Sequence, residues 1–344
     1  MAEERLDTLD RIRPFVLIAS FVVGIAMGTL LEGWGGLLDM VIYYAVILLI
    51  YSITLGVHFG DVMHSFRNLR FFGLAWLHNF VIIPIIAWGL ALLFLSGNPA
   101  IYVGVILYLV IPCTDWFLMF TAMAKGDVPL GLALLPTNLL IQILLLPVYL
   151  YLFAGEVIPF QMGALVETFS IFIFLPFALA WVTRWLMGKL RTAAWREKVL
   201  DRSLPPAQLL ILVVIIFAMF AGQTDVILEH VGPLTTVFVP VVLFFLINFA
   251  LAYGLSWISR LRYKEYALLT CTAVARNSPL GLAIAFGLFP DQPLVQVAII
   301  IGVIIELPIL IAMVRMLRLV GVRFPLPGEK GEEAMAGDCS RREK

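Results

Sequence analysis

Two short polar stretches interrupt long apolar segments of this sequence. Pro112, Cys113, Thr114 and Asp115 follow one run of Leu, Val and Ile, and residues 276–279 break a second apolar segment far downstream. Proline removes a helix hydrogen bond. Hydrocarbon tolerates neither free backbone groups nor an unpaired charge, so such breaks must be buried in protein or line a cavity. We therefore expect the two breaks to face each other and to form a solute site.

Charged residues occur in both breaks, Asp115 in the first and Arg276 in the second. A charge at the centre of a membrane span costs about 2.5–3.5 kcal/mol on the insertion scale, so each needs a partner. We expect these two to form a direct or water-bridged pair, with Asn277 and Ser278 lining the same site. The alternative is an ion pair that only locks the crossing in place.

Three further side chains extend this candidate site. Glu306 is a third charge within an apolar segment, and a buried carboxylate that exchanges a proton could couple transport, as could Asp115. Cys113 is a soft ligand suited to trivalent arsenic or antimony as substrate, although a cysteine in a membrane helix is often a small apolar filler. Asn138 could complete the cavity or hydrogen-bond a neighbouring helix.

Composition defines the setting of these residues. Of 344 residues, 62% are hydrophobic and 13% are charged, against about 25% charged in soluble proteins. The sequence therefore predicts an all-α integral membrane protein with the lipid bilayer as a partner. A net charge of zero gives no argument for a nucleic-acid partner. Neither a P-loop nor a hydrolase motif occurs, so we expect no cofactor, no ATP-driven pump and no enzyme.

Hydrophobic runs of about 20 residues predict ten membrane spans. They cover residues 14–31, 37–57, 71–95, 100–123, 128–153, 165–187, 205–221, 233–258, 266–289 and 293–316. With the N-terminus inside, every Lys and Arg except Arg276 falls on the cytoplasmic side, and the charged residues of the outer loops are all acidic. We therefore expect a protein of the cytoplasmic (inner) membrane with both termini cytoplasmic.

Ten spans divide into two halves of five, which must enter the membrane from opposite sides. The sequence thus predicts two inverted repeats with a broken fourth and a broken ninth helix. Residues 1–188 would hold the first repeat and the start of the second, with the repeat boundary near 156–165. Residues 189–204 would form a cytoplasmic basic loop, 205–321 the rest of the second repeat, and 322–344 a disordered tail.

Six short stretches carry a resemblance to a known family. They are Pro112-Cys113-Thr114, Lys125-Gly126-Asp127, Pro136-Thr137-Asn138, Asn277-Ser278, the run 280–285 and Glu306-Leu307-Pro308. In these the chain resembles the arsenite efflux permeases of the bile acid/arsenite/riboflavin transporter superfamily. The resemblance implies that Cys113 contacts arsenite and that Glu306 is important for function. It also implies a core domain of spans three to five and eight to ten, beside a panel domain of the other four.

Two departures from related sequences bear on coupling. The sodium-coupled bile acid branch has a glutamate and a glutamine as sodium ligands where this chain has Thr272 and Arg276, and a Ser-Asn pair where it has Phe117 and Leu118. Sodium coupling of that design is therefore not expected, and Arg276 could act as a tethered cation. The arsenite permeases, in turn, are not expected to carry Asp115 and Arg276.

The sequence as a whole predicts a secondary transporter that extrudes arsenite or antimonite, coupled to protons through Glu306 or Asp115. An organic-anion symporter that uses Arg276 as an anion clamp is the alternative within the same class. A membrane-bound solute sensor is an alternative of another class, although no soluble output domain supports it. The expected partner is a small inorganic or organic anion or oxyacid.

Overall fold

The computed structural model describes residues 2–28, 30, 34–56, 68–113, 116–155, 157–158, 162–190 and 193–323. Within these ranges the chain is helical, without a strand, and seven helical segments are long and apolar enough to cross a membrane. These are Gly35–Gly56, Leu69–Leu95, Val128–Ala154, Gly163–Lys189, Arg202–Gly222, Val231–Ile258 and Pro293–Val320. The protein is therefore an all-helical, multi-pass membrane protein.

Three predicted spans fall on shorter apolar helices. The first falls on α1 (Ala2–Gly28), whose apolar part is Phe15–Gly28. The fourth falls on α6 (Pro99–Val110) and α7 (Trp116–Met123), and the ninth on α15 (Tyr263–Val274) and α16 (Ser278–Leu288). Both interruptions lie where the sequence predicts breaks.

The remaining helices, apart from the short α12, form continuous spans, and three of these spans contain a π-helical turn. Their bounds are α2 (Gly35–Gly56), α4 (Leu69–Leu77), η3 (His78–Ile82), α5 (Ile83–Leu95), α8 (Val128–Tyr149), η4 (Leu150–Ala154), α9 (Met162–Phe169), η5 (Ser170–Phe174), α10 (Leu175–Leu190), α11 (Ala193–Gly222), α12 (Thr224–Glu229), α13 (Val231–Thr235), α14 (Phe238–Ile258) and α17 (Pro293–Arg323).

Two sequence predictions about local structure are wrong. Most of the segment 189–204 is helical, because α10 reaches Leu190 and α11 begins at Ala193. Its Ala, Arg, Glu, Lys and Leu residues are strong helix formers, so the membrane helix continues as a polar helix. Pro279 does not interrupt a helix, since it lies in the first turn of α16, where proline is well tolerated. The expected tail, beyond the end of α17 at Arg323, lies outside the described residues.

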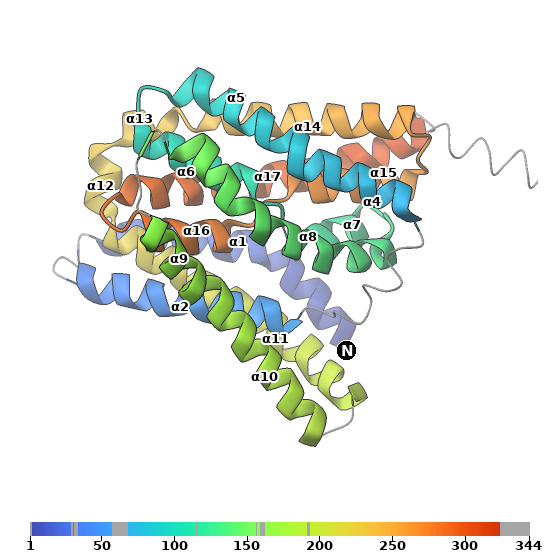
Figure 1. The fold of residues 1–344 in the computed structure, drawn as a ribbon, viewed down its shortest axis with the longest axis horizontal. Coiled ribbons are helices and arrows are strands. Elements are labelled where there is room, and N and C mark those ends of the chain that lie inside the picture. Colours follow the sequence, from blue (N-terminus) through green and yellow to red (C-terminus); the bar gives the residue numbers. More distant parts are fainter. Residues whose placement is uncertain are drawn as a thin grey trace, which may run out of the picture.

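The helices form two groups that meet along the broken spans. In one group, α1 and α2 pack on α11, and α10 packs on α2, in the lower part of Figure 1. In the other, α6 packs against α5 and α17, and α15 packs against α14 and α7. Helix α16 contacts α2 and α9, so it lies where the two groups meet.

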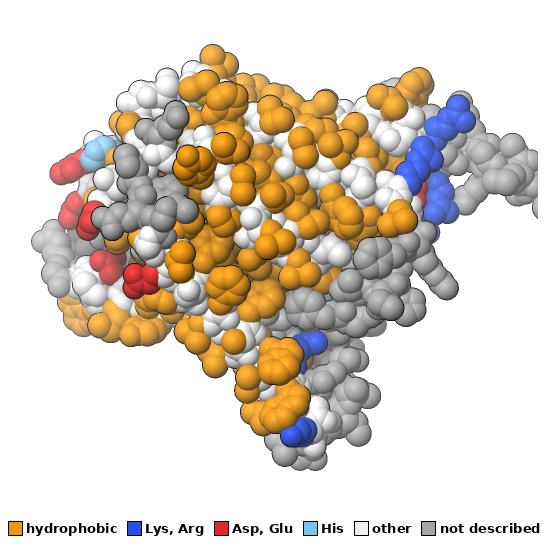
Figure 2. Space-filling view, in the orientation of Figure 1, with side chains coloured by type: hydrophobic (Ala, Val, Ile, Leu, Met, Phe, Trp, Pro, Cys, Tyr) orange, Lys and Arg blue, Asp and Glu red, His pale blue; other side chains and the backbone are white. Residues whose placement is uncertain are grey.

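Surface side chains are sorted along the molecule. Hydrophobic side chains cover most of the face in Figure 2, as expected for contact with lipid. Acidic side chains gather at the end near α12, and Lys and Arg side chains gather at the other end, near the start of α4 and the end of α10. This separation matches the division of charge on which the predicted membrane orientation depends.

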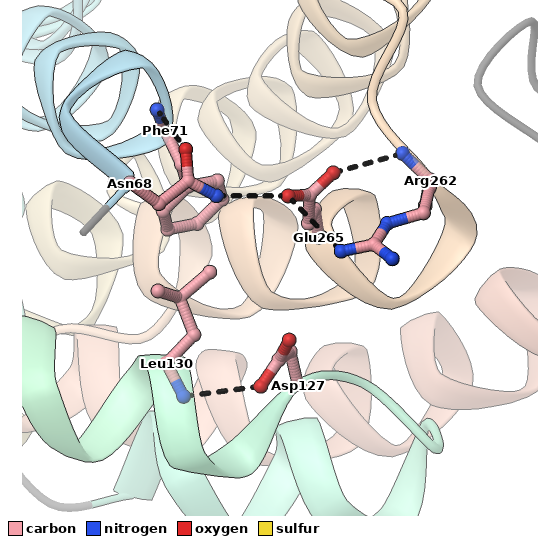
Figure 3. A network of polar contacts seen from close by, with 6 residues as sticks. All are labelled: Asn68, Phe71, Asp127, Leu130, Arg262 and Glu265. Carbon is pink, nitrogen blue, oxygen red and sulfur yellow. Dashed lines mark hydrogen bonds and ion pairs between the residues drawn. The ribbon is translucent and has the colours of Figure 1, made fainter.

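A polar network joins the starts of three helices at the basic end (Figure 3). Asn68 caps α4 and donates to Glu265 Oε1 at 3.0 Å, while Glu265 Oε2 accepts from the Arg262 N–H at 3.0 Å. The Asp127 side chain caps α8, and the Asp127 backbone N–H donates to Lys264 O at 3.1 Å. Helices α4, α8 and α15 therefore begin together, as the ten-span scheme requires of its third, fifth and ninth spans.

Glycines bring α6 and α17 into close contact. A Cβ atom on Gly104 of α6 would collide with the main-chain oxygen of Val295, and one on Gly302 of α17 would lie 2.5 Å from the Tyr108 ring. Small residues at such positions let membrane helices approach closely, which maximises packing where no hydrophobic driving force exists. The contact positions Tyr108 against the middle of α17.

We expect Gly104→Ala to destabilise the protein by about 1–3 kcal/mol, because the new methyl group must push α17 away. Gly89→Ala is the matched control, since a Cβ atom there meets nothing within 4 Å. The measurement is thermal unfolding of both purified variants in detergent. Equal midpoints for the two variants would contradict the close α6–α17 contact.

Candidate functional site: a crossing of two broken helices

The two helix breaks pair through their backbones. The Cys113 N–H donates to Ala275 O at 3.0 Å, and the Asn277 N–H donates to Ile111 O at 2.9 Å. These bonds form an isolated antiparallel bridge between Pro112 and Arg276. The bridge needs no N–H from residue 112. Proline, which has none, therefore fits there without the loss of a hydrogen bond. The breaks therefore face each other, in the arrangement expected from the sequence.

The Arg276 side chain donates hydrogen bonds to main-chain carbonyls at the C-terminal ends of two helices. Its guanidinium donates to Leu109 O at 2.9 Å near the end of α6 and to Val274 O at 3.3 Å at the end of α15. It also donates to Thr272 O at 3.2 Å and to Ala273 O. The last carbonyls of a helix lack partners within the helix and carry partial negative charge. One buried cation therefore satisfies acceptors of both broken helices.

Glu306 supplies the opposite charge. Its Oε1 accepts from the Arg276 backbone N–H at 2.9 Å, and its Oε2 accepts from the Tyr108 hydroxyl at 2.7 Å. Arg276 and Glu306 are 3% and 2% exposed, so both charges are removed from water. The described charge beside Arg276 is thus Glu306 of α17. The expected partner, Asp115, lies outside the described residues together with Thr114.

Cys113 is buried beside the crossing, at the start of α7. Its Sγ accepts a hydrogen bond from the Trp116 N–H at 3.2 Å. The sulfur therefore caps the first turn of α7 at the crossing, a position compatible with both roles predicted from the sequence, a substrate ligand and a small apolar filler.

Ser278 and the two buried charges line a small cavity at the boundary between the helix groups. Its volume is about 10 Å³, and a neighbouring cavity measures about 20 Å³. The first is lined by Trp116, Leu212, Arg276, Ser278, Pro279, Val303 and Glu306, and the second shares Trp116, Leu212 and Pro279. Each is large enough for about one water molecule. Asn277 caps α16 beside them, accepting from the Leu280 N–H at 3.2 Å.

Asn138 belongs to a separate polar cluster. Its Nδ2 donates to Thr272 Oγ1 at 3.2 Å, and Asn79 Nδ2 donates to the same oxygen at 3.1 Å. It therefore joins α8 to α15, the hydrogen-bonding role left open by the sequence. Sequence reasoning missed Tyr108, Asn79 and the buried His78. A polar or titratable residue inside an apolar run was the available signal for all three.

Two features of this chain define its class. It is a multi-pass membrane protein, and two discontinuous helices cross inside it at a buried charged centre, an arrangement used by secondary transporters. Residues 43–230 match the model of the sodium bile acid symporter family. The chain belongs to this family, whose members are membrane transporters. This confirms the resemblance predicted from the short stretches.

Relatives along most of the chain include proteins named for different solutes. The arsenical-resistance protein Acr3 of Corynebacterium glutamicum is 23% identical over 329 residues, which cover 90% of this chain and 89% of the relative. The uncharacterised protein YbaS of Bacillus subtilis is 24% identical, with 85% and 92% covered. The probable sodium/metabolite cotransporter BASS2 of rice is 24% identical, with 74% and 58% covered.

A double-mutant cycle tests the pairing of Arg276 with Glu306. Arg276→Gln and Glu306→Gln should each lower stability by about 3–5 kcal/mol, because each leaves one buried charge without its counter-ion. The double variant should cost less than the sum of the single ones. The same cycle with Asp115→Asn in place of Glu306→Gln tests the pairing of Asp115 with Arg276 predicted from the sequence. Additive effects of Arg276→Gln and Glu306→Gln would contradict the pairing of Arg276 with Glu306. Chemical unfolding in mixed micelles gives the required free energies.

Proposed function

We propose that this protein is a secondary transporter that extrudes arsenite or antimonite across the cytoplasmic membrane in exchange for protons. The observation that carries the proposal is the buried thiol of Cys113 at the crossing of two broken helices, held by the Trp116 amide. The relative named as an arsenical-resistance protein supports the choice of solute.

A single thiol suits transport of these solutes. Trivalent arsenic and antimony are soft and prefer sulfur ligands. When the Cys113 thiol displaces one hydroxide from the oxyacid, one As–S bond forms, one As–O bond breaks, and the thiol proton leaves with that hydroxide as water. The reverse step returns the oxyacid. Several thiols would retain the metalloid, whereas one releases it readily. Asn277 and Ser278 would contact its remaining hydroxyl groups, and Thr114 and Asp115 would complete the site.

Alternating access supplies the transport cycle. The ten spans would form two inverted repeats, and the group containing α4–α8 and α14–α17 would rock against α1, α2 and α9–α11. The two small cavities support this division, since Trp116 and Pro279 line both from one side and Leu212 of α11 lines both from the other. The separation of acidic and basic ends supports cytoplasmic termini.

The contacts of Arg276 favour a tethered cation over an anion clamp. Of the five N–H donors of an arginine side chain, four are directed at main-chain carbonyls. Few remain for an organic anion, which weakens the alternative of an organic-anion symporter. A fixed guanidinium at these carbonyls would replace a bound sodium ion. Coupling would then use protons, with Glu306 and Asp115 as the candidates given by the sequence.

Cys113→Ser should abolish protection against arsenite, because a hydroxyl is a poor ligand for soft trivalent arsenic. The measurement is arsenite accumulation in an efflux-deficient bacterial host. Cys271→Ser is the matched control, since Cys271 is equally buried but lies within α15. An intact protein that leaves arsenite accumulation unchanged would refute arsenite efflux. Full protection by Cys113→Ser would refute only the role of the thiol.

Replacement of sodium by potassium should leave the transport rate of the intact protein within about twofold, because Arg276 supplies the positive charge at the helix ends. The double variant Thr272→Glu and Arg276→Gln restores residues of the sodium-coupled branch. It should unfold at a higher temperature in sodium chloride than in potassium chloride, whereas the intact protein should not. A sodium requirement of the intact protein would contradict the tethered cation.

A further inference from the structure

His78 is a titratable group in the membrane interior that the proposed site does not use. It is 0% exposed and begins the π-helical turn η3, between α4 and α5. π-Helical turns within α-helices occur frequently at functional sites, since they change the direction of a few side chains. The ring lies against α14, where Asn248 is also fully buried.

The contacts of Asn248 determine which nitrogen of His78 carries the hydrogen. Asn248 Nδ2 donates to Phe244 O at 2.8 Å, which fixes the orientation of the amide. Asn248 Oδ1 therefore faces His78 Nε2, at a distance of 3.2 Å. A carbonyl oxygen only accepts hydrogen bonds, so Nε2 must be the protonated nitrogen of the neutral ring.

In this tautomer Nδ1 carries no hydrogen, and its lone pair can accept a hydrogen bond although the ring is buried. Among the described residues, His78 Nδ1 has no hydrogen-bond partner. A buried acceptor without a donor costs about 1–3 kcal/mol, so a persistent orphan requires an explanation. Nδ1 can accept a hydrogen bond from a water molecule, or it can bind a proton.

His78 is linked to the crossing through one turn of α14. The Phe244 carbonyl holds Asn248, and the Phe244 ring lies 5.4 Å from the Arg276 guanidinium carbon. Within the described part of the chain, Arg276 is the charged side chain that acts on His78 electrostatically. The helices that pack against η3 are α4, α5 and α15, and α14 contacts the His78 ring through Asn248. Helix α15 ends at the carbonyls that accept from Arg276. The two groups therefore sense each other's charge.

We propose that His78 Nδ1 carries the coupling proton, an inference that rests on proton-coupled transport as the function. In one orientation Nδ1 takes a proton from hydronium and forms an N–H bond, and in the other it returns that proton to water. No other bond changes. A positive His78 is repelled by Arg276 at the crossing, so a proton on Nδ1 and a solute at the crossing affect each other's binding. By reciprocity, the bound proton alters solute binding at the crossing.

The test uses the purified full-length protein in liposomes, with arsenite as the probe. His78→Gln retains an N–H group that can donate to Asn248 but cannot titrate. Arsenite accumulation driven by a pH gradient should fall by about tenfold or more, and the rate should lose its dependence on pH. Arsenite exchange at equal pH on both sides should stay within about twofold, because exchange needs no net proton movement. His230→Gln, in a half-buried histidine near α12, should behave as the intact protein.

Three outcomes separate this proposal from the proposed function. Gradient-driven accumulation that survives in His78→Gln overturns the role of His78 and leaves transport intact. Loss of exchange together with accumulation assigns His78 a structural role and overturns the proposal. Absence of arsenite exchange by the intact protein overturns the proposed function itself.

A second variant decides the case in which His78→Gln does not fold. Asn248→Asp places a carboxylate against Nε2 and stabilises the protonated ring, so the pH profile of transport should move to higher pH. A profile that stays unchanged in a folded Asn248→Asp protein overturns the role of His78 as proton carrier.

Discussion

The unpaired N–H and C=O groups at helix ends inside a membrane must find hydrogen-bond partners within the protein. The rest of this structure depends on which partners they find. The ends of α6 and α15 and the starts of α7 and α16 meet at the crossing, where lipid offers no hydrogen bonds. Asn277 caps α16, Cys113 Sγ accepts from the first turn of α7, and the two breaks pair through their backbones. The Arg276 guanidinium satisfies the carbonyl ends. A cation of this shape can address several carbonyls at once, which the compact ammonium group of lysine cannot do.

The buried cation in turn determines the packing around it. Arg276 requires a counter-charge, and Glu306 supplies it from α17, which approaches α6 closely enough for the Tyr108 hydroxyl to donate to the same carboxylate. Gly104 and Gly302 permit that approach. A buried pair of this kind need not stabilise the fold more than an apolar contact would, but removal of one partner is costly. The pair therefore fixes the register between α17 and the crossing, and it explains why charged residues persist in an otherwise apolar interior.

The sequence predicted the positions of the breaks but not how their charges are satisfied. Hydropathy and the prolines locate the interrupted spans, and the cost of a charge in lipid marks Arg276 as important from its position in the sequence alone. Its contacts are mostly main-chain carbonyls, which have no signature in the side-chain sequence. Asp115 is the partner predicted from the sequence because it lies in the facing break, and this stays a prediction since Asp115 lies outside the described residues. The proximity of Glu306 depends on helix packing that spacing along the chain does not encode. The helical extension of α11 was missed because basic residues are equally compatible with a loop and with a polar helix.

The same geometry limits where coupling can occur. A guanidinium fixed at the helix ends never leaves the protein, so it cannot draw energy from a gradient as an exchanging sodium ion would. Under the proposed function, the energy must therefore enter through a group that exchanges protons with water. Both oxygens of Glu306 already accept hydrogen bonds, one from the Arg276 backbone N–H and one from the Tyr108 hydroxyl. His78 differs because its Nδ1 has no hydrogen-bond partner among the described residues. This nitrogen is linked to the crossing through Asn248 and Phe244, so under the proposal a proton bound there and a solute bound at the crossing alter each other's affinity.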